Sequence, residues 1–339
     1  MDLYIFPDAA YKSNGYGIGV NYAYNKLKPK ENDIVVWYTD IEKEKMLYLR
    51  DKDFIIKKKS FYSFRSVINL LSSKDRTEPH YCDLSFLCQY DFKNIHLDES
   101  FFYRPIKKMF PHKHMSIRFH NCYARIYDRQ RMMDIDLDWK YLTKLKNMYK
   151  VEKEIFQDRN VHKIFISDED RDYYRNIFGI SSDSETWPYL PDLNCAMKNR
   201  NPLNLDHRLI WFGGVESHKK SSIDWFINEV FPIVKEKIVD AEFHLWGKNT
   251  QLFNNPTLGV YGHGYFDGNG MPSNNSLYIN PDIIGGGIKL KLLSLIEDGV
   301  PFISSFFGFE GYSHDLIDNK YIIVEEENKW AERIINIIK

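Results

Sequence analysis

The chain has 339 residues, of which 43% are apolar and 27% charged, and its formal net charge is −1. This balance indicates a globular protein of two domains, and it excludes a disordered chain and a nucleic-acid binder that needs a broad basic surface. No run of about 18 apolar residues is present, so we expect no membrane-spanning helix.

The first half predicts an alternation of strands and helices. A strand, a glycine-bearing loop, a helix and a second strand open the chain, which is the βαβ start of an open parallel sheet. Apolar residues at helical spacing then predict one long helix, and acidic residues mark the start of another. The predicted strands are 3–6, 33–38, 53–56, 84–87, 114–119 and 163–167, and the predicted helices are 19–27, 136–158 and one from 168.

A connection between domains is predicted at residues 186–207, which hold three prolines and show no periodicity. We place one domain at residues 1–190 and the other at 191–339. The alternation then restarts, with strands at 208–213, 242–246, 258–261, 276–280, 301–305 and 321–324, and helices at 221–238, 289–297 and from 329. The expected architecture is α/β, with two Rossmann-like domains facing a central cleft and a last helix able to pack back on the first domain.

A glycine-rich loop, GGGIKLK at residues 285–291, leads from the strand at 276–280 into the next helix. Glycines let backbone amides approach a ligand, and a helix N-terminus offers unpaired N–H groups and partial positive charge. In open α/β sheets, ligands bind beyond the carboxyl ends of strands, where this loop falls. The loop therefore predicts a diphosphate site; the alternative is a flexible turn followed by a solvated helix face.

A second strand-to-helix turn of this kind follows the strand at 208–213. Gly213 and Gly214 precede Lys219 and Lys220, and two serines then offer N-caps for a helix. A capped helix with exposed lysines is an equal alternative for this turn alone. Two basic, glycine-containing turns in one domain are harder to explain by sheet construction.

These two turns resemble the C-terminal half of GT-B glycosyltransferases, in the group-one or family-four retaining class. The resemblance covers residues 208–312, and its later part reads PDIIGGGIKLKLLSLIEDGVPFISSFFGFEG over residues 281–311. It implies a nucleotide-diphosphate sugar as donor substrate. We expect no cofactor and no essential metal. It also implies that residues 1–190 bind the acceptor and residues 191–339 the donor. The residues that it places at the donor are Gly213, Gly214, Lys220, His263 near the base, Gly286, Gly287, Ile288, Lys289, Lys291 and Glu297.

The sequence departs from the family pattern around the glycine-rich loop. Members commonly carry two glutamates there, and these positions are Gly286 and Ser294 in this chain. The second glutamate normally holds the ribose hydroxyls, so either Glu297, one helical turn later, replaces it or the ribose is held differently. The arginine usual near the first lysine falls on Gly214.

In the N-terminal half, the segment KSNGYGIGV at residues 12–20 follows the first strand. The family has a glycine-rich loop facing the cleft at this point, so the resemblance places Gly15, Tyr16 and Gly17 beside the donor or acceptor. A pattern of alternating glycines is weak by itself, and a tight turn is equally compatible with it.

The strand at 114–119 leads into a polar group that contains Arg118, His120 and Asn121. In the family, a histidine at this point reaches toward the donor sugar, so the resemblance makes His120 the candidate catalytic residue, with Arg118 and Asn121 beside it. Because the chain has eleven histidines, an ordinary surface or core role is the alternative.

Two further segments have a functional and an ordinary interpretation. Asp134 and Asp136 form a DxD pattern, which holds a metal in the other large glycosyltransferase fold; capping of the following helix is the preferred interpretation. The basic and aromatic residues 101–115 suit contact with a membrane surface or an anionic acceptor, but ordinary strand and loop is preferred.

The cellular setting is predicted from the cysteines and the N-terminus. Cys82, Cys88, Cys122 and Cys195 form no CxxC pair, and no secretory signal is visible, so we expect a reduced, cytoplasmic protein without a zinc site. A peripheral position at the inner face of a membrane is compatible with this.

The expected function is transfer of a sugar, with retention, from a nucleotide-diphosphate donor to a hydroxyl of a glycan or lipid-linked acceptor, in polysaccharide or glycan biosynthesis. Two rivals are a nucleotide-sugar epimerase on the same fold and a non-catalytic nucleotide- or glycan-binding module.

Overall fold

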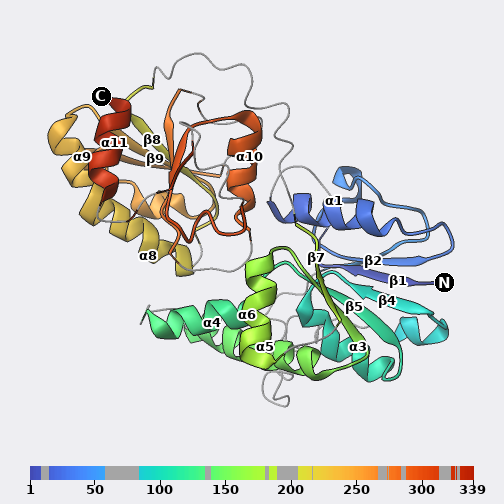
Figure 1. The fold of residues 1–339 in the computed structure, drawn as a ribbon. Coiled ribbons are helices and arrows are strands. Elements are labelled where there is room, and N and C mark those ends of the chain that lie inside the picture. Colours follow the sequence, from blue (N-terminus) through green and yellow to red (C-terminus); the bar gives the residue numbers. More distant parts are fainter. Residues whose placement is uncertain are drawn as a thin grey trace. The chain divides into compact units, whose positions relative to one another are not determined.

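The computed structural model describes residues 1–8, 15–57, 84–133, 139–179, 183–188, 205–215, 217–265, 273, 275–283, 288–312, 322–324, 326 and 329–339. The chain divides into two compact units. The first comprises Met1–Met132 and Asp138–Tyr189, and the second comprises Met133–Leu137 and Leu190–Lys339. Each unit is built on its own parallel sheet with helices on its faces (Figure 1).

The sheet of the first unit has the strand order β3-β2-β1-β4-β5-β6-β7, with all neighbours parallel. Continuous apolar runs such as the fully buried β2 are typical of strands covered on both faces. The order changes direction between β1 and β4. The strands are β1 Leu3–Phe6, β2 Ile34–Tyr38, β3 Phe54–Ile56, β4 Asn94–Leu97, β5 His114–Phe119, β6 Val161–Phe165 and β7 Ser184–Thr186.

Helices cover both faces of this sheet. Val20 and Ala23 of α1 pack against Phe6 and Trp37 on one face, and Figure 1 shows α3, α5 and α6 on the other side. The helices are α1 Gly15–Leu27, α3 Tyr103–Met109, α4 Tyr123–Met132, α5 Trp139–Gln157 and α6 Asp168–Phe178, and short 3-10 turns lie at Lys43–Lys45, Ser85–Gln89 and Ser100–Phe102.

The second unit has the strand order β10-β9-β8-β11-β12-β13, again with parallel neighbours. Its order changes direction between β8 and β11. The strands are β8 Arg208–Phe212, β9 Glu242–Trp246, β10 Val260–Gly264, β11 Leu277–Asn280, β12 Phe302–Ser304 and β13 Ile322–Val324. Short 3-10 turns lie at Thr250–Phe253 and Pro256–Leu258.

The helices of the second unit are α8 Ser217–Trp225, α9 Phe231–Lys237, α10 Leu290–Asp298 and α11 Trp330–Ile338. Figure 1 shows α8, α9 and α11 on one side of the sheet and α10 on the other. The last helix places Trp330, Ile334 and Ile338 in the core of this second unit, together with Leu209 and Phe243 of the sheet.

Several predicted elements differ from the structure. The strand expected at 84–87 is a 3-10 turn, because buried Leu84 and Leu87 stand three residues apart and so share one side of a helical turn. The strand β4 and the helices α3 and α4 were not predicted. Most of the connection predicted at 186–207 lies outside the described residues.

The single helix predicted at 221–238 begins earlier, at Ser217, and is interrupted by a π turn at Phe226–Val230. Pro232, in the first turn of α9, has no N–H to donate to the preceding turn. The π turn takes up this break without ending the helical path, which is a usual cause of such a turn.

Candidate active site

The carboxyl ends of β8 and β11 lie side by side at the point where the strand order of the second sheet changes direction. Connections leave such a point toward opposite sides, which opens a crevice where ligands of α/β proteins bind. The chain continues from β8 through Gly213 and Gly214 into α8, and from β11 through Asp282 and a glycine-rich loop into α10. The two turns singled out from the sequence therefore meet at one place.

The turn after β8 depends on glycine because two backbone segments cross there. Gly213 donates its N–H to the Trp246 carbonyl at 2.9 Å, and Gly247 donates to the Gly264 carbonyl at 2.6 Å. A Cβ atom at Gly247 would lie 2.0 Å from the carbonyl oxygen of Gly213, and the φ of Gly247 is 130°. A side chain at this position is therefore excluded by backbone sterics. A Cβ at Gly214, in contrast, would meet no described atom within 4 Å.

A buried ion pair lies within the second turn, between the end of β11 and the start of α10. The Nζ of Lys291, in the first turn of α10, lies 3.1 Å from the Oδ2 of Asp282, and their side chains are 15% and 2% exposed. The pair is held in place by α8, because Ile283 donates its N–H to the Ser222 hydroxyl at 3.4 Å. Lys291 also lies over the Trp211 ring, 5.2 Å from its centroid.

Further lysines surround this pair. Burial by itself raises the pKa of Asp282, but the charges of Lys291, Lys219 and Lys289 outweigh burial and hold that pKa below its usual range. Lys289, the N-cap residue of α10, places its ammonium 4.3 Å from the centroid of the Phe307 ring. Three cations and one carboxylate therefore gather at the start of α10, which suits a dianionic ligand.

Lys220, which the family resemblance placed at the donor, pairs with another residue. It is exposed and forms an ion pair with Asp224, one helical turn later, at 2.5 Å. Its neighbour Lys219 is the one whose charge acts on Asp282 and Lys291. Both lysines were candidates from the sequence, but no feature of the sequence indicated that Lys219 lies closer to the ion pair than Lys220.

The other donor-side candidates are spread around α10 and β10. Ile288 is buried beside Lys289, and Glu297 is exposed near the end of α10. Gly286 and Gly287 lie outside the described residues. His263 on β10 stacks on the Trp246 ring, with centroids 3.9 Å apart, and its Nε2 lies 2.8 Å from the Nδ1 of His244.

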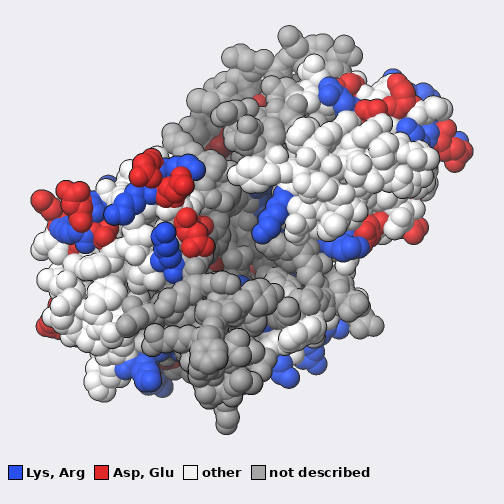
Figure 2. Space-filling model, turned by 180° about the vertical axis from the view of Figure 1, so that it is seen from behind, with Lys and Arg blue, Asp and Glu red and all other residues white. Residues whose placement is uncertain are grey.

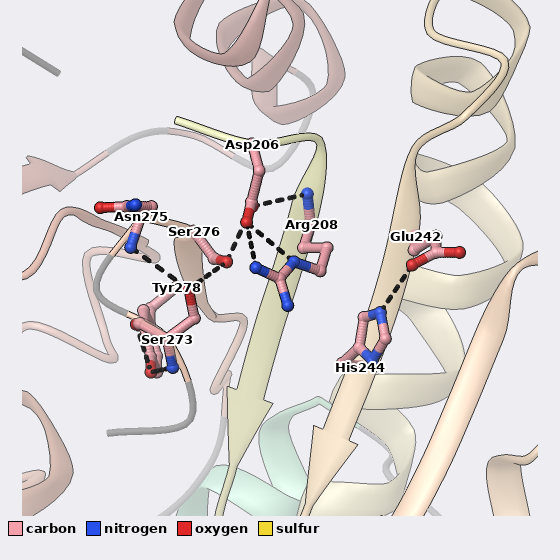
Figure 3. Close-up of polar contacts among 8 residues, drawn as sticks. All are labelled: Asp206, Arg208, Glu242, His244, Ser273, Asn275, Ser276 and Tyr278. Atoms are coloured by element: carbon pink, nitrogen blue, oxygen red, sulfur yellow. Dashed lines mark hydrogen bonds and ion pairs between the residues drawn. The ribbon is translucent and has the colours of Figure 1, made fainter. Parts of the chain in front are cut away.

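The His263 ring belongs to a row of rings that follows β9 and β10. Burial and the nearby His244 lower the pKa of His263, so its imidazole is neutral at physiological pH. His244 is held from the other side by Glu242, at 3.0 Å (Figure 3). The stacked His263 and Trp246 rings thus lie near the carboxyl ends of β10 and β9, beside the glycine crossing.

A separate polar cluster fixes β8 against β11 at their amino ends (Figure 3). Asp206 accepts hydrogen bonds from the Arg208 side chain and from the Ser276 hydroxyl, the latter at 2.8 Å. The Tyr278 hydroxyl donates to the Ser273 carbonyl at 3.0 Å. Because this cluster lies at the opposite edge from the lysines, we assign it a structural role in aligning the two strands.

The first unit carries its own buried polar cluster at a strand-order change. Asp98 follows β4, and its Oδ1 accepts from Arg118 at 2.9 Å while its Oδ2 lies 2.7 Å from the Nε2 of His120. The Nη1 of Arg118 lies 2.9 Å from the same Nε2. Because a carboxylate accepts and a guanidinium donates, the tautomer of His120 decides which of these two groups its Nε2 bonds. Burial is the main cause that lowers the pKa of His120, with Arg118 adding to it, and this outweighs the opposing effect of Asp98.

Asp98 was not among the candidates from the sequence. The signal was available, because Asp98 and Glu99 follow a short alternating segment, Asn94–Leu97, which was not recognised as a strand. Glu99 accepts a hydrogen bond from the Asn121 amide at 3.1 Å. Arg118 and His120 thus contact Asp98, while Asn121 contacts the adjacent Glu99.

The glycines predicted as a loop form a helix instead. Gly15, Tyr16 and Gly17 are the first turn of α1, which begins four residues before the predicted start. Glycine adopts helical dihedrals without a steric penalty, although at an entropic cost. Arg118 contacts the following turn of α1, since its Nη1 donates to the Gly19 carbonyl at 3.1 Å. The predicted glycine loop is therefore the first turn of a helix that contacts Arg118 through Gly19.

Glu152 is a fully buried carboxyl group behind this cluster. It accepts hydrogen bonds from the Tyr174 hydroxyl at 2.5 Å, from the Ala124 N–H at 2.7 Å and from the Ser100 hydroxyl at 3.2 Å. Burial raises its pKa to about 8, although these hydrogen bonds act in the opposite direction. It ties α5 to the start of α4 and to α6, and so supports the Asp98 side of the sheet.

Replacement of Glu152 by Gln is expected to remove a pH dependence of stability. The pKa in the folded state lies above the value of about 4.3 in unfolded chains, so the stability linked to this group is fully present below about pH 4 and is lost as the pH rises through 8. The advantage of the wild type over the variant in unfolding free energy should therefore shrink between pH 5 and 9, by up to about 1.4 kcal/mol per pH unit. Chemical denaturation at several pH values measures it, and a constant difference would contradict the assignment.

Acidic and basic side chains are intermixed over the described surface that Figure 2 shows. Within the described ranges, no group of three His, Cys, Asp or Glu side chains is arranged to hold a metal ion, and no helix is long and apolar enough to cross a membrane. Asp134 and Asp136 lie outside the described residues. Residues 103–109, predicted as strand and loop, form the helix α3, whose Pro105 is tolerated because it lies in the first turn.

No known protein family and no curated protein matches the chain by sequence. Solved structures do match it. WaaG, a glycosyltransferase involved in lipopolysaccharide biosynthesis, has a TM-score of 0.65 and 12% identity, over 100% of this chain and 89% of that chain. Sucrose-phosphate synthase of Thermosynechococcus elongatus has a TM-score of 0.60 and 13% identity, over 100% and 88%.

HepE of Anabaena, solved in complex with UDP and glucose, has a TM-score of 0.59 and 10% identity, over 100% of this chain and 89% of that chain. Identities this low make the comparison one of fold. The chain has the GT-B fold of these structures, with two parallel sheets and their helices, and the predicted fold class is confirmed.

Proposed function

We propose that this GT-B chain is a glycosyltransferase that uses a nucleotide-diphosphate sugar as its donor. The observation that carries the proposal is the gathering of Lys219, Lys289 and Lys291 around Asp282 at the strand-order change of the second sheet. The neighbours WaaG and HepE are a glycosyltransferase and a protein solved with UDP and glucose, which supports the same donor class.

The proposed chemistry places the main electrostatic demand on the leaving group. The bond from the sugar C1 to the diphosphate breaks, a bond from C1 to the acceptor oxygen forms, and the acceptor hydroxyl loses its proton to the departing diphosphate. Negative charge grows on the diphosphate as it leaves. Fixed cations and the N-terminus of α10 stabilise that charge without reorganising, which is the largest contribution in many enzymes.

The second part of the proposal concerns the first unit. His120, oriented by Asp98, holds the donor sugar for attack, and the unit as a whole binds the acceptor, a hydroxyl of a glycan or lipid-linked molecule. Retention of configuration, a role in glycan biosynthesis, independence from metals and a cytoplasmic location belong to the same proposal. No carboxylate is assigned as a nucleophile.

A panel of nucleotide sugars tests this function. The purified chain is incubated with each donor, and nucleotide release is measured with and without simple glycan acceptors. Release or transfer with one donor supports the proposal. Epimerisation of the free donor favours an epimerase on the same fold, and binding without turnover favours a binding module. Binding of no nucleotide sugar would remove the proposal altogether.

Lys219→Ala is expected to weaken nucleotide-sugar binding more than Lys220→Ala does. Lys219 acts on the buried pair, whereas Lys220 is exposed and turned toward Asp224. The expected loss for Lys219 is about 1 kcal/mol, since one charged hydrogen bond contributes on this order. Calorimetric titration measures both, with the exposed Lys237→Ala as control. Equal losses for both lysines, or a larger loss for Lys220, would show that the family position is the one that binds.

A further inference from the structure

The Asp282–Lys291 pair holds unused hydrogen-bonding capacity inside the protein. Among the described residues, which do not include 284–287, the Oδ1 of Asp282 and the Nζ of Lys291 are both buried without a hydrogen-bond partner, although Nζ lies 3.1 Å from Oδ2. Buried polar atoms nearly always have partners, so each orphaned atom calls for an explanation. A ligand at the start of α10 would supply acceptors for the amine, and this links the pair to the proposed diphosphate site.

The groups around Lys291 come from several elements of the second unit. Asp282 follows β11, Lys219 lies on α8, Lys289 is the N-cap of α10, and the Trp211 ring belongs to β8. Burial favours the neutral amine, and Lys219 adds like-charge repulsion, so the pKa of Lys291 falls below its usual range. Asp282 is the group that opposes both effects.

We infer that Asp282 is a positioning residue that keeps Lys291 protonated while the site is empty, and that the diphosphate takes over this role when it binds. The inference rests on the proposed function and deepens it. If Lys291 is already protonated in the empty site, the donor binds without uptake of a proton. The pair thus prepares one of the three cations for the ligand, and Asp282 itself touches neither donor nor acceptor.

Replacement of Asp282 by Asn separates this role from simple packing, because the amide keeps the shape and removes the charge. In the variant, Lys291 is a buried amine with Lys219 nearby and no counter-charge, so it loses its proton in the empty site. A donor then has to bind together with a proton. Above the lowered pKa of Lys291, the affinity of the variant should therefore fall up to tenfold for each pH unit, while that of the wild type changes much less.

Calorimetry measures the pH dependence of the affinity between pH 6.5 and 9. UDP-glucose and GDP-mannose are both tried, and the one that binds more tightly is used. Both probes are chosen because their diphosphates carry no group that titrates in this range. Titration in two buffers of different ionisation enthalpy gives the number of protons taken up. We expect close to one proton per site for Asp282→Asn at the upper pH values, and clearly fewer for the wild type.

Matched variants make the result specific to this pair. Asp282→Asn combined with Lys291→Arg should bind without proton uptake, because a guanidinium does not deprotonate. Asp240→Asn, which removes an exposed carboxylate paired with His207, should behave as the wild type. Equal proton uptake and an equal pH profile in Asp282→Asn and the wild type would overturn the inference.

A ligand-free measurement keeps this inference distinct from the proposed function. In protein labelled with 13C at lysine Cε, the Lys291 signal, identified by its loss in Lys291→Arg, should titrate at lower pH in Asp282→Asn than in the wild type. An unchanged midpoint would overturn the inference even if donors bind. If no probe binds the wild type, the proposed function fails, and the titration of the Lys291 signal still tests the role of Asp282. Asp282→Ser, which leaves room for a water beside the amine, replaces Asp282→Asn if that variant does not fold.

Discussion

Replacing both Lys289 and Lys291 by alanine is expected to weaken nucleotide-sugar binding by about 2 kcal/mol or more, roughly 30-fold in Kd. Both ammonium groups stand at the N-terminus of α10, and Lys291 is buried against Asp282. A buried cation attracts a diphosphate through a low dielectric, so its loss is larger than that of a surface charge. Calorimetric titration with the tightest donor from the panel measures the change, and an unchanged Kd would remove the diphosphate site.

The control for this prediction has to separate binding from folding. Alanine at residue 291 leaves the Asp282 carboxylate buried without its partner, which by itself destabilises the second unit. The double replacement Lys291→Met with Asp282→Asn removes both charges, and replacing a buried pair by neutral groups is often tolerated. It should therefore unfold near the wild-type temperature and still bind weakly. If it binds as tightly as the wild type, Lys291 does not contact the ligand.

Replacing His120 by alanine is expected to lower kcat/KM for sugar transfer by about 100-fold, while the Kd for the nucleotide alone stays within twofold. The expectation follows from the proposed role of His120 in holding the sugar, because loss of orientation at the reacting centre costs on this order. The nucleotide Kd is unaffected because Lys219, Lys289 and Lys291 all belong to the second unit. Steady-state kinetics and calorimetry on the same preparation measure the two effects.

Asp98→Asn tests whether Asp98 orients His120. It keeps His120 in the chain but removes the carboxylate that lies 2.7 Å from its Nε2. The transfer rate should fall less than in His120→Ala, with an altered pH profile. Because Arg118 also loses its carboxylate partner, thermal unfolding is measured for each variant. Full activity in His120→Ala, or a parallel loss of nucleotide binding, would assign His120 a structural role only.

The sequence allowed the fold to be predicted where the apolar pattern was strong. Apolar runs such as 34–38 and 209–212 predicted strands close to those observed, because buried parallel strands need such runs. Shorter segments were missed or misassigned. Asn94–Leu97 alternates polar and apolar residues over only four positions, and the segment at 84–87 suits a strand and a helical turn equally.

The sequence predicted which strand ends and turns form the candidate site, but not which side chains face it. Glycines and lysines near a strand end indicated where an anion binds, since those residue types act through the backbone and through charge. Which of Lys219 and Lys220 faces the site depends on the angle at which α8 leaves its turn, and the sequence does not encode that angle locally. Asp98 and Asp282 gain their importance from burial and from partners 20 and 9 residues away, at Arg118 and Lys291.

The crossing of the backbone at Gly213 and Gly247 sets a limit on how this site can evolve. Most damaging replacements can be offset, because a neighbouring side chain shrinks or turns aside. Here the clash at 2.0 Å would be with a carbonyl oxygen of the main chain, which no second replacement removes. Side chains that contact the donor can therefore change together with the donor, whereas glycine at residue 247 cannot be replaced without altering the main-chain geometry of the site.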